Sequence, residues 1–242
     1  MKVMAINSSP NMDEGNTAVI SGPFTEGMKE AGAEVETLYT KKLNIKPCQG
    51  EFNCWLKTPG KCFQKDDMQW ILPKLDEANI WVLATPLYVD GMSGPMKNFI
   101  DRIIPLVEPF IELRDGHCRH PRRGEHSDDK KVVLVSSCGF WEKDNFDALI
   151  VHVEAICRNL KGQLAGALLR PHGGALKRML EMGVDLEDII EAARDAGRQL
   201  IRDGRISEET LETVSRDLLS REDYLSIAND NFRQALEAAK AA

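Results

Sequence analysis

The chain lacks any hydrophobic run long enough to cross a lipid bilayer, which argues against a membrane-spanning protein. Its 242 residues also begin without the charged and apolar regions of a signal peptide, so we expect a cytoplasmic protein with no membrane partner. Six cysteines without a secretory pattern then indicate thiols or metal ligands rather than a disulfide framework. Internal repeats and low-complexity segments are absent too, which excludes repeat architectures and leaves an ordinary globular fold.

An excess of positive charge is also missing, and with it the main sequence sign of a nucleic-acid partner. The net charge is −7, and residues 181–242 account for all of it with 15 acidic and 8 basic side chains. We interpret this acidic segment as the solvated face of C-terminal helices. The charged content of 29% is otherwise ordinary, and the length suits one large domain better than two.

Two common nucleotide-binding motifs are absent from the first turn of the chain. Residues 2–7 read as a short strand, and residues 8–17, SSPNMDEGNT, connect it to a helix. This turn has neither the Gly-Lys-Ser/Thr ending of a Walker loop nor a GxGxxG motif. It offers hydroxyl, amide and backbone N–H donors at a helix N-terminus, which suits a monophosphate. An alternative interpretation is that Ser9, Asn16 and Thr17 only cap the helix.

A second strand-to-helix turn lies in residues 84–102, ATPLYVDGMSGPMKNFIDR. It follows the apolar run 80–84, is punctuated by proline and glycine, and passes into apolar residues at helical spacing: Met96, Phe99, Ile100 and Ile103. A buried strand that ends in such a loop is the usual ligand edge of a parallel α/β sheet. The ring of Tyr88 and the thioether of Met92 suit a flat heterocyclic ligand.

Strand-like runs recur along the chain with helical patterns between them, at residues 2–7, 34–39, 79–85, 131–137 and 163–169. This alternation predicts an α/β protein with a doubly wound, five-stranded parallel sheet in the order 2-1-3-4-5. The ligand is then expected where the strand order reverses, between strands one and three, with the two turns side by side. Gly22-Pro23 falls inside the first helix, and we expect a kink or a late start there.

The chain is helical after the fifth strand. Residues 186–201 have one apolar face and follow Asp185, a suitable cap, and further helices are predicted to begin near Ser207 and Ser220. We therefore divide the chain into a domain of residues 1–204 and a helical extension of residues 205–242. Such an extension most often wraps a neighbouring subunit or covers the ligand cleft, and the sequence does not separate these options.

The order SSPN…GNT, TPLYVDGMSGPMKNFIDR and SSCGFWE resembles the NADPH-dependent FMN reductase family of flavodoxin-like proteins, close to its iron–sulfur flavoprotein branch. The resemblance covers about residues 1–170. It implies a flavodoxin-like fold, bound FMN, and electron transfer from NADPH or NADH to a second substrate. That acceptor would be a quinone, a nitro or azo compound, a metal ion or a protein. The resemblance also implies a homo-oligomer, either a homodimer or a tetramer.

Three loops are expected to bind FMN by this resemblance. The phosphate would be held by Ser9, Asn11, Asn16 and Thr17. One side of the ring would be lined by Pro86, Leu87, Tyr88, Val89, Asp90 and Gly91, and the other by Ser137, Cys138 and Gly139. Small residues let the backbone approach a planar ligand. Cys138 is either a redox-active thiol or simply a small apolar residue. We name no catalytic acid or base, because the flavin carries the chemistry.

The cysteine segment of residues 47–67 departs from the iron–sulfur flavoproteins it resembles. Their four cluster cysteines follow the spacing C-x2-C-x2-C-x4–7-C, and the matching positions here are Cys48, Glu51, Cys54 and Cys62. A [4Fe–4S] cluster prefers four thiolates, so we do not expect one. Zinc is chemically reasonable, but structural zinc sites usually contain close C-x2–4-C pairs. We favour a loop with free thiols that shapes the cleft.

Residues 112–131 form a polar insertion. Its histidines and cysteine, His117, Cys118, His120 and His126, suggest a metal site, but their spacing fits no standard motif and we expect a mobile surface loop. A second hypothesis is that Arg119, Arg122 and Arg123 attract the 2′-phosphate of NADPH or another anionic substrate.

Two other functions stay open. One is an electron-transfer flavoprotein that takes electrons from a ferredoxin-type partner. The other is a non-enzymatic binding module, because fold alone does not establish activity.

Overall fold

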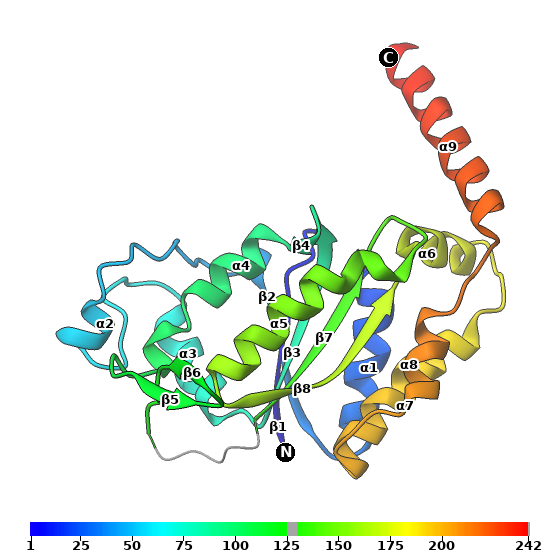
Figure 1. Ribbon diagram of the computed structural model, residues 1–242. Coiled ribbons are helices and arrows are strands. Elements are labelled where there is room, and N and C mark those ends of the chain that lie inside the picture. Colours follow the sequence, from blue (N-terminus) through cyan, green and yellow to red (C-terminus); the bar gives the residue numbers. More distant parts are fainter. Residues whose placement is uncertain (125–129, 242) are drawn as a thin grey trace.

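The structure is a computed structural model that describes residues 1–124 and 130–241. Its centre is a parallel sheet whose strands lie in the order β2 (Glu34–Tyr39), β1 (Lys2–Asn7), β3 (Ile80–Tyr88), β7 (Lys130–Ser137) and β8 (Gly162–Arg170) (Figure 1). This is the predicted order, so the predicted α/β fold is confirmed. The short strand β4 (Gly91–Met92) pairs antiparallel with the end of β3. The strand predicted for residues 79–85 is β3, which continues three residues further, to Tyr88, before the chain folds back into β4.

Successive side chains along each strand point to opposite faces of the sheet and so contribute to two separate hydrophobic cores. In β1, Val3 and Ala5 pack on one face of the sheet, whereas Met4 and Ile6 pack on the other. All four are buried, as expected for the centre of a parallel sheet that is covered on both sides. This pattern fixes the register, because a slip of one residue would exchange the two faces.

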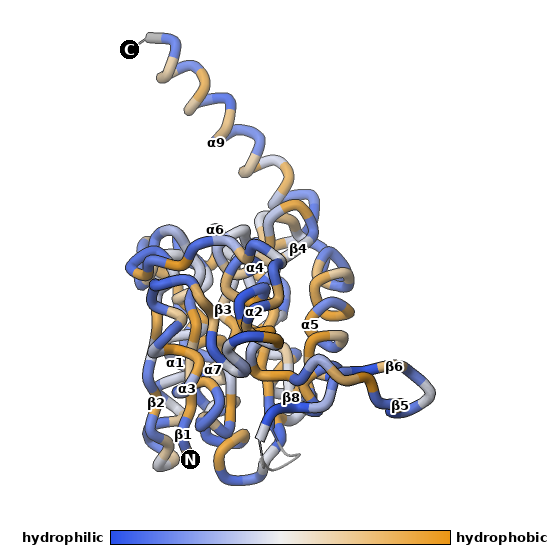
Figure 2. The backbone as a smooth tube through the Cα atoms, turned by 90° about the vertical axis from the view of Figure 1, so that its left-hand side faces the viewer, coloured by the Kyte–Doolittle hydropathy of each residue, from blue (hydrophilic) through white to orange (hydrophobic). Residues whose placement is uncertain are grey.

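Helices cover both faces of the sheet (Figures 1 and 2). One face packs against α1 (Ala18–Glu30), α6 (Gly173–Glu181), α7 (Glu187–Asp203) and α8 (Glu208–Ser215). The other packs against α3 (Met68–Glu77), α4 (Gly94–Asp101) and α5 (Asp147–Asn159). Helix α6 was not predicted, because its nine residues follow β8 without a recognisable cap. Within the described residues, no helix is both long and apolar enough to span a membrane.

Helices α1 and α7 approach each other at two glycines. A Cβ atom on Gly27 would lie 1.9 Å from the carbonyl oxygen of Arg194, and one on Gly197 would lie 2.1 Å from that of Phe24. The predicted late start of α1 is wrong, since the helix begins at Ala18 and continues past Pro23. The preceding residue, Gly22, has no Cβ to crowd the proline ring, which makes the helical conformation accessible there.

The predicted mobile loop of residues 112–131 is wrong in its first part. Strands β5 (Glu112–Arg114) and β6 (His117–Arg119) form an antiparallel hairpin that projects from the body (Figure 2). Asp115 and Gly116 have positive φ angles and form its two-residue turn. The tight turn and the short pairing order a segment whose composition alone indicated a loop. His126 lies outside the described residues.

The C-terminal helices begin where their caps predict. Ser207 Oγ accepts a hydrogen bond from the N–H of Thr210, and Ser220 Oγ accepts one from the N–H of Asp223. Asp185 accepts from the N–H of Glu187 at the start of α7. The last helix, α9 (Arg221–Ala241), extends away from the body (Figures 1 and 2).

Candidate functional site

Three loops meet at the carboxyl edge of the sheet: the first loop (residues 8–17), the second loop (residues 86–94) and the third loop (residues 137–142). Two hydrogen bonds join them directly. Ser93 Oγ donates to Ser8 Oγ at 2.8 Å, and the hydroxyls of Thr17 and Ser137 lie 2.9 Å apart. Loops that are far apart in the sequence therefore form one continuous edge, at the point where the strand order reverses.

The first loop offers unused hydrogen-bond donors. Within the described part of the chain, no acceptor is paired with the backbone N–H groups of Asn16 and Thr17. No described side chain caps α1 either, because the hydroxyl of Thr17 bonds to Ser137 instead. The capping interpretation of this loop therefore loses its support. Gly15 completes the turn, since a Cβ there would lie 2.2 Å from Ser9 Oγ.

Two lysines bring positive charge to the first loop. Lys177, from α6, donates to the carbonyl of Glu14 at 2.6 Å, and Lys41 donates to that of Pro10 at 2.8 Å. Their ammonium groups favour an anion in this loop. Neither contact is predictable from the sequence, because 160 residues or more separate Lys177 from the loop it contacts and no local motif marks either lysine.

The second loop is a tight hairpin whose tip points into solvent. Val89 and Asp90 have φ angles of +48° and +58°, as in a two-residue turn of the mirror-image kind. Val89 is 100% exposed and Tyr88 52% exposed, whereas Pro86 is buried within β3. A β-branched residue in this left-handed region is strained. The strain is stored at the edge of the candidate site.

The third loop begins with two buried residues and continues with an exposed glycine and an exposed aromatic residue. Ser137 and Cys138 are buried, while Gly139 and Phe140 are exposed. Burial raises the pKa of the Cys138 thiol above its usual value. This disfavours the thiolate and supports the interpretation of Cys138 as a small apolar residue.

The start of α9 holds the third loop in place. The hydroxyl of Tyr224 donates to the carbonyl of Gly139, and the indole of Trp141 donates to that of Leu219 at 3.1 Å. Arg221 forms an ion pair with Glu142 and lies 5.7 Å from the centre of the Trp141 ring. These contacts were not predicted, since the extension was assigned no residue-level role.

A buried pair, Arg170 and His172, lies behind the third loop. The guanidinium of Arg170 donates to carbonyls at the C-terminal end of α8, including those of Val214 and Arg216 at 2.7 Å each. Burial lowers the pKa of Arg170 to about 10, so it stays charged near neutral pH. The oriented carbonyls of a helix end compensate this charge.

The structure places the predicted site residues in the three loops at this one edge. Those of the first loop are Ser9 and Thr17, which are buried, and Asn11 and Asn16, which are exposed. Those of the other loops are Pro86, Leu87, Tyr88, Val89, Asp90, Gly91, Ser137, Cys138 and Gly139. Pro86, Ser137 and Cys138 face the interior, which leaves the exposed tip and Gly139 to contact a ligand.

The cysteine segment does not fit a four-thiolate cluster. Cys48, Cys54 and Cys62 border a small cavity of about 20 Å³, room for about one water molecule. The fourth position is Glu51, and Arg102 donates to Cys62 Sγ at 3.3 Å while it pairs with buried Asp66. Among residues 1–124 and 130–241, no three His, Cys, Asp or Glu side chains are placed to hold a metal ion.

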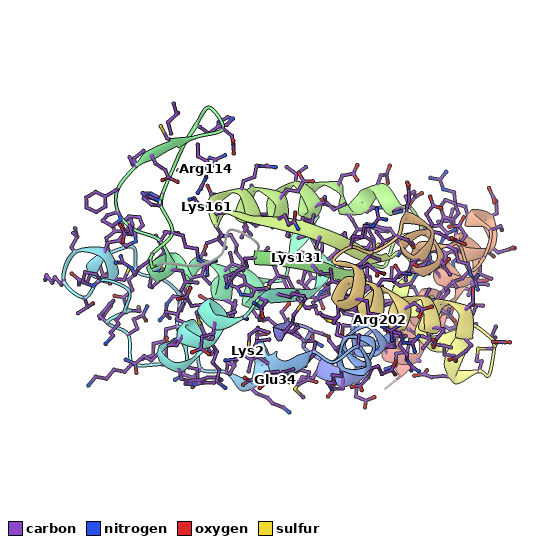
Figure 3. The ribbon with its side chains drawn as sticks, turned by 90° about the horizontal axis from the view of Figure 1, so that it is seen from below. Lys2, Glu34, Arg114, Lys131, Lys161 and Arg202 are labelled. Atoms are coloured by element: carbon purple, nitrogen blue, oxygen red, sulfur yellow. The ribbon has the colours of Figure 1, made fainter. Side chains whose placement is uncertain are left out.

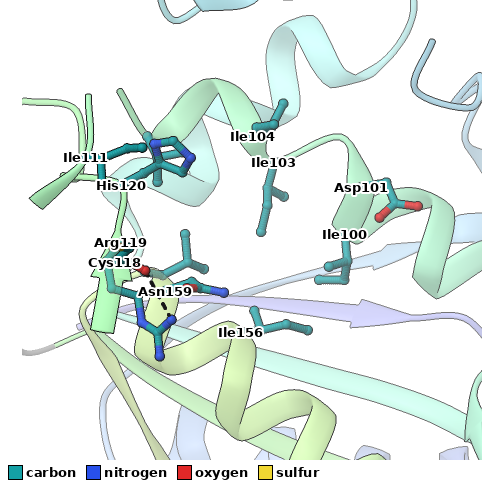
Figure 4. Close-up of a pocket in the computed structure, with 12 residues that line it drawn as sticks. Ile100, Asp101, Ile103, Ile104, Ile111, Cys118, Arg119, His120, Ile156 and Asn159 are labelled. Atoms are coloured by element: carbon teal, nitrogen blue, oxygen red, sulfur yellow. Dashed lines mark hydrogen bonds between the residues drawn. The ribbon is translucent and has the colours of Figure 1, made fainter. Parts of the chain in front are cut away.

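The basic residues of the insertion lie away from the three loops. Arg122 pairs with Asp76 at 2.8 Å, at the amino edge of the sheet, where Lys2 and Lys131 also lie (Figure 3). Arg119 borders an isoleucine-lined cavity of about 370 Å³ between α4, α5 and the hairpin (Figure 4). The hypothesis that these arginines bind the 2′-phosphate therefore gains no support from the geometry of one subunit.

Comparisons with known proteins agree with this arrangement. A family model described as NADPH-dependent FMN reductase matches residues 1–156. An iron–sulfur flavoprotein of Archaeoglobus fulgidus is 40% identical over 102 residues, which are 42% of this chain and 48% of that protein. Another, from Methanocaldococcus jannaschii, is 37% identical over 115 residues, 48% and 58% of the two chains. The chain thus spans about half the length of the curated relatives it matches.

Solved structures show the same fold. An FMN-dependent NADH-azoreductase from Bacillus anthracis, in complex with FMN, has a TM-score of 0.60 at 14% identity and covers 83% of this chain and 99% of its own. An NAD(P)H:quinone oxidoreductase from Methanothermobacter marburgensis has a TM-score of 0.56 at 19% identity, with 83% and 96% covered. At these identities the likeness concerns the fold alone.

Proposed function

This chain belongs to the NADPH-dependent FMN reductase family, and from that premise we propose that it is an FMN-dependent oxidoreductase that takes electrons from NADPH or NADH. The observation that carries the proposal is the junction of the three loops through the Ser8–Ser93 and Thr17–Ser137 hydrogen bonds. It places a donor-rich loop beside an exposed hairpin at the switch point of the sheet, where such folds bind their ligands.

The first loop would hold the phosphate. The free N–H groups of Asn16 and Thr17 point to an anion at the N-terminus of α1, where the helix dipole also favours negative charge. Ser9 and Asn11 supply further polar groups, and Lys177 adds nearby positive charge. The donor set therefore fits a monophosphate.

The second and third loops would hold the ring. Tyr88 and Phe140 are exposed aromatic residues on two different loops, and no heavy atom of a described residue lies within 4 Å of a Cβ atom placed on Gly139. Bound FMN would supply hydride and electron transfer. The protein would orient the ring, hold one edge with backbone groups and leave the other edge open to the acceptor.

The acceptor is proposed by class only: a quinone, a nitro or azo compound, a metal ion or a protein carrier. The exposed hairpin tip suits acceptors of different shapes, because Val89 and Asp90 do not enclose a fixed volume. A homo-oligomer and the absence of a nucleic-acid partner belong to the same proposal, and the net charge of −7 favours the latter.

A second candidate is an electron-transfer flavoprotein. The similarity to two iron–sulfur flavoproteins favours it, as do three thiols around one cavity. Glu51 at the second ligand position weighs against an internal iron–sulfur relay.

The test is the absorbance spectrum of the purified protein before and after anaerobic NADPH. A flavin band at about 450 nm that bleaches supports the reductase, and a band that NADPH leaves unchanged supports the carrier. A colourless protein that does not bind added FMN would overturn both. Thr17→Val should weaken FMN binding, whereas Thr213→Val, a matched change on α8, should not.

A further inference from the structure

The cysteine segment brings three thiols, rather than four, to one small cavity. Cys48, Cys54 and Cys62 border this cavity of about 20 Å³. Glu51 stands at the remaining cysteine position of the iron–sulfur flavoprotein pattern, and its carboxylate accepts a hydrogen bond from the N–H of Asn53 at 3.3 Å, where the short helix α2 (Asn53–Leu56) begins. The thiols are therefore placed to react with one another rather than to share a cluster.

The backbone folds Cys62 back toward Cys54. The N–H of Gly60 donates to the carbonyl of Cys54 at 2.9 Å, which closes a tight turn between two cysteines that are eight positions apart. Burial raises the pKa of the Cys54 thiol, and the negative charge of Cys62 raises it further, more than that of Cys48 does. Of the two other thiols at the cavity, Cys62 is thus the one that acts more strongly on Cys54.

A buried arginine contacts the sulfur of Cys62. Arg102 donates to Cys62 Sγ at 3.3 Å. Its guanidinium is fixed by the carboxylate of Asp66, at 2.6 and 3.0 Å, and by the carbonyl of Lys46. The side chains of Arg102 and Asp66 are 1% and 0% exposed, so water does not screen the guanidinium. It can compensate the negative charge that the sulfur carries when it attacks a disulfide or leaves one.

We propose that Cys54 and Cys62 are a reversible dithiol–disulfide pair that exchanges with small aliphatic disulfides. Cys62 is partly exposed and Cys54 is buried, so a reagent reaches Cys62 first. The Cys62 thiolate attacks one sulfur of the reagent, the S–S bond of the reagent breaks, and the released thiolate takes up a proton. The thiol of Cys54 then loses its proton and attacks Cys62, which expels the second reagent thiol and closes the intrachain bond.

The exchange is independent of the flavin. In sum, one reagent disulfide becomes two thiols, and the protein loses two hydrogens, so neither FMN nor NADPH takes part. The second step is intramolecular, and the effective concentration of Cys54 at Cys62 is about millimolar or higher. Cys118, by contrast, is exposed and borders a different cavity whose described lining contains no other cysteine. We therefore expect Cys118 to stop at a mixed disulfide with the reagent.

Peptide mapping after oxidation tests the pairing. The folded protein, without NADPH, is treated with 2-hydroxyethyl disulfide and quenched in acid, the remaining thiols are blocked with iodoacetamide, and the tryptic peptides are weighed. Trypsin cuts at the lysines between Cys54 and Cys62, so their bond appears as two joined peptides. We expect this bond, with the reagent on Cys118. A bond from Cys48 to either cysteine, reagent adducts alone, or no reaction overturns the proposal.

Two variants separate the roles of the thiols. Cys54→Ser removes the second step, so the reagent should accumulate on Cys62, and a variant without this adduct contradicts the proposal. Cys48→Ser is the matched control and should form the Cys54–Cys62 bond as the unchanged chain does; loss of the bond in this control overturns the pairing. Circular dichroism confirms that each variant is folded.

Reversal by thiol gives an independent measurement. Added 2-mercaptoethanol should remove the reagent from Cys118 at a concentration at least about tenfold lower than the one that opens the Cys54–Cys62 bond. Equal sensitivity of the two would show that the cysteines are not held together and would overturn the proposal. No readout uses the flavin, so failure of this proposal and failure of the proposed function are distinguishable.

Discussion

At the scale of single residues, His172 carries its proton in an unusual place. Its Nε2 accepts hydrogen bonds from the N–H of Leu218 and from Arg170, both at 3.2 Å, so the ring is neutral with its proton on Nδ1. The side chain is fully buried, and among the described residues Nδ1 has no partner. Burial, and then the charge of Arg170, lower the pKa of His172 to about 4.

This histidine predicts a loss of stability in mild acid. Between pH 6.5 and 4 the unfolded chain binds a proton that the native chain does not, so the free energy of unfolding falls as the pH falls. The loss from this group reaches about 3 kcal/mol. His172→Asn keeps a hydrogen-bond acceptor in the side chain. Asparagine also adopts left-handed backbone angles readily, and the φ of residue 172 is +41°. Urea unfolding at pH 7.5 and 4.5 should show a smaller loss in the variant; an equal loss contradicts the assignment.

Val89 predicts a gain of stability on substitution. Its positive φ strains the backbone, and its full exposure means that no packing is lost when it is replaced. Val89→Asn should therefore stabilise the flavin-free protein by about 1 kcal/mol and raise Tm by about 2–4 °C. Val151→Asn, at an exposed position of α5 with helical geometry, is the matched control and should give no gain. A similar rise in both variants would contradict the strain argument.

At the scale of elements, the crossing of α1 and α7 depends on Gly27. A methyl group there would enter the space of the Arg194 carbonyl, and neither backbone can yield without separating the helices. Gly27→Ala should lower the free energy of unfolding by about 2–3 kcal/mol. Glu26→Ala, one residue away and exposed, should change it by less than about 0.5 kcal/mol. Chemical denaturation of both variants gives the comparison, and similar stabilities would show that the helices can separate freely.

The contact between α9 and the third loop predicts an effect on ligand binding. Tyr224→Phe removes one hydroxyl from the bond to Gly139 and leaves the ring beside His172. If the third loop holds FMN, the dissociation constant should rise about fivefold, the value of one lost hydrogen bond. Fluorescence titration measures it, with Ser226→Ala on the same helix as control. An unchanged FMN dissociation constant in Tyr224→Phe would mean that the C-terminal extension does not affect binding at the site.

At the scale of the whole molecule, ligand binding must raise the stability of the fold. FMN at about 100 times its dissociation constant adds about 2.7 kcal/mol, or about 5–10 °C in Tm for a chain of this size. Riboflavin lacks the phosphate that the first loop is built to hold, so its shift at the same concentration should be clearly smaller. Thermal unfolding with each ligand decides, and equal shifts would mean that the first loop does not bind a phosphate.

The sequence predicts the sheet well because its signals are local. The strand-like runs 2–7 and 34–39 match β1 and β2 to the residue, and the caps at Ser207 and Ser220 locate α8 and α9. The end of β3 differs from the prediction, because the two turn residues of this hairpin are Val89 and Asp90, and neither is the glycine or asparagine that usually marks such a turn.

The candidate site is only partly predictable for a related reason. Loops that follow parallel strands must meet at one edge, so the association of the first and second loops follows from strand order. The contacts of Lys177, Tyr224 and Arg170 join residues far apart in the sequence. How far each of these side chains is buried depends on tertiary packing, which no local sequence pattern encodes.

The buried position of Arg170 has a consequence for how such a chain can change over generations. Its guanidinium is charged, fully enclosed and satisfied by the last carbonyls of α8. A lineage that shortened the chain before residue 205 would keep this cation in its interior while losing the carbonyls that compensate it, a change that destabilises a fold by several kcal/mol. We therefore expect a chain that keeps Arg170 to keep the distant segment 205–216 as well.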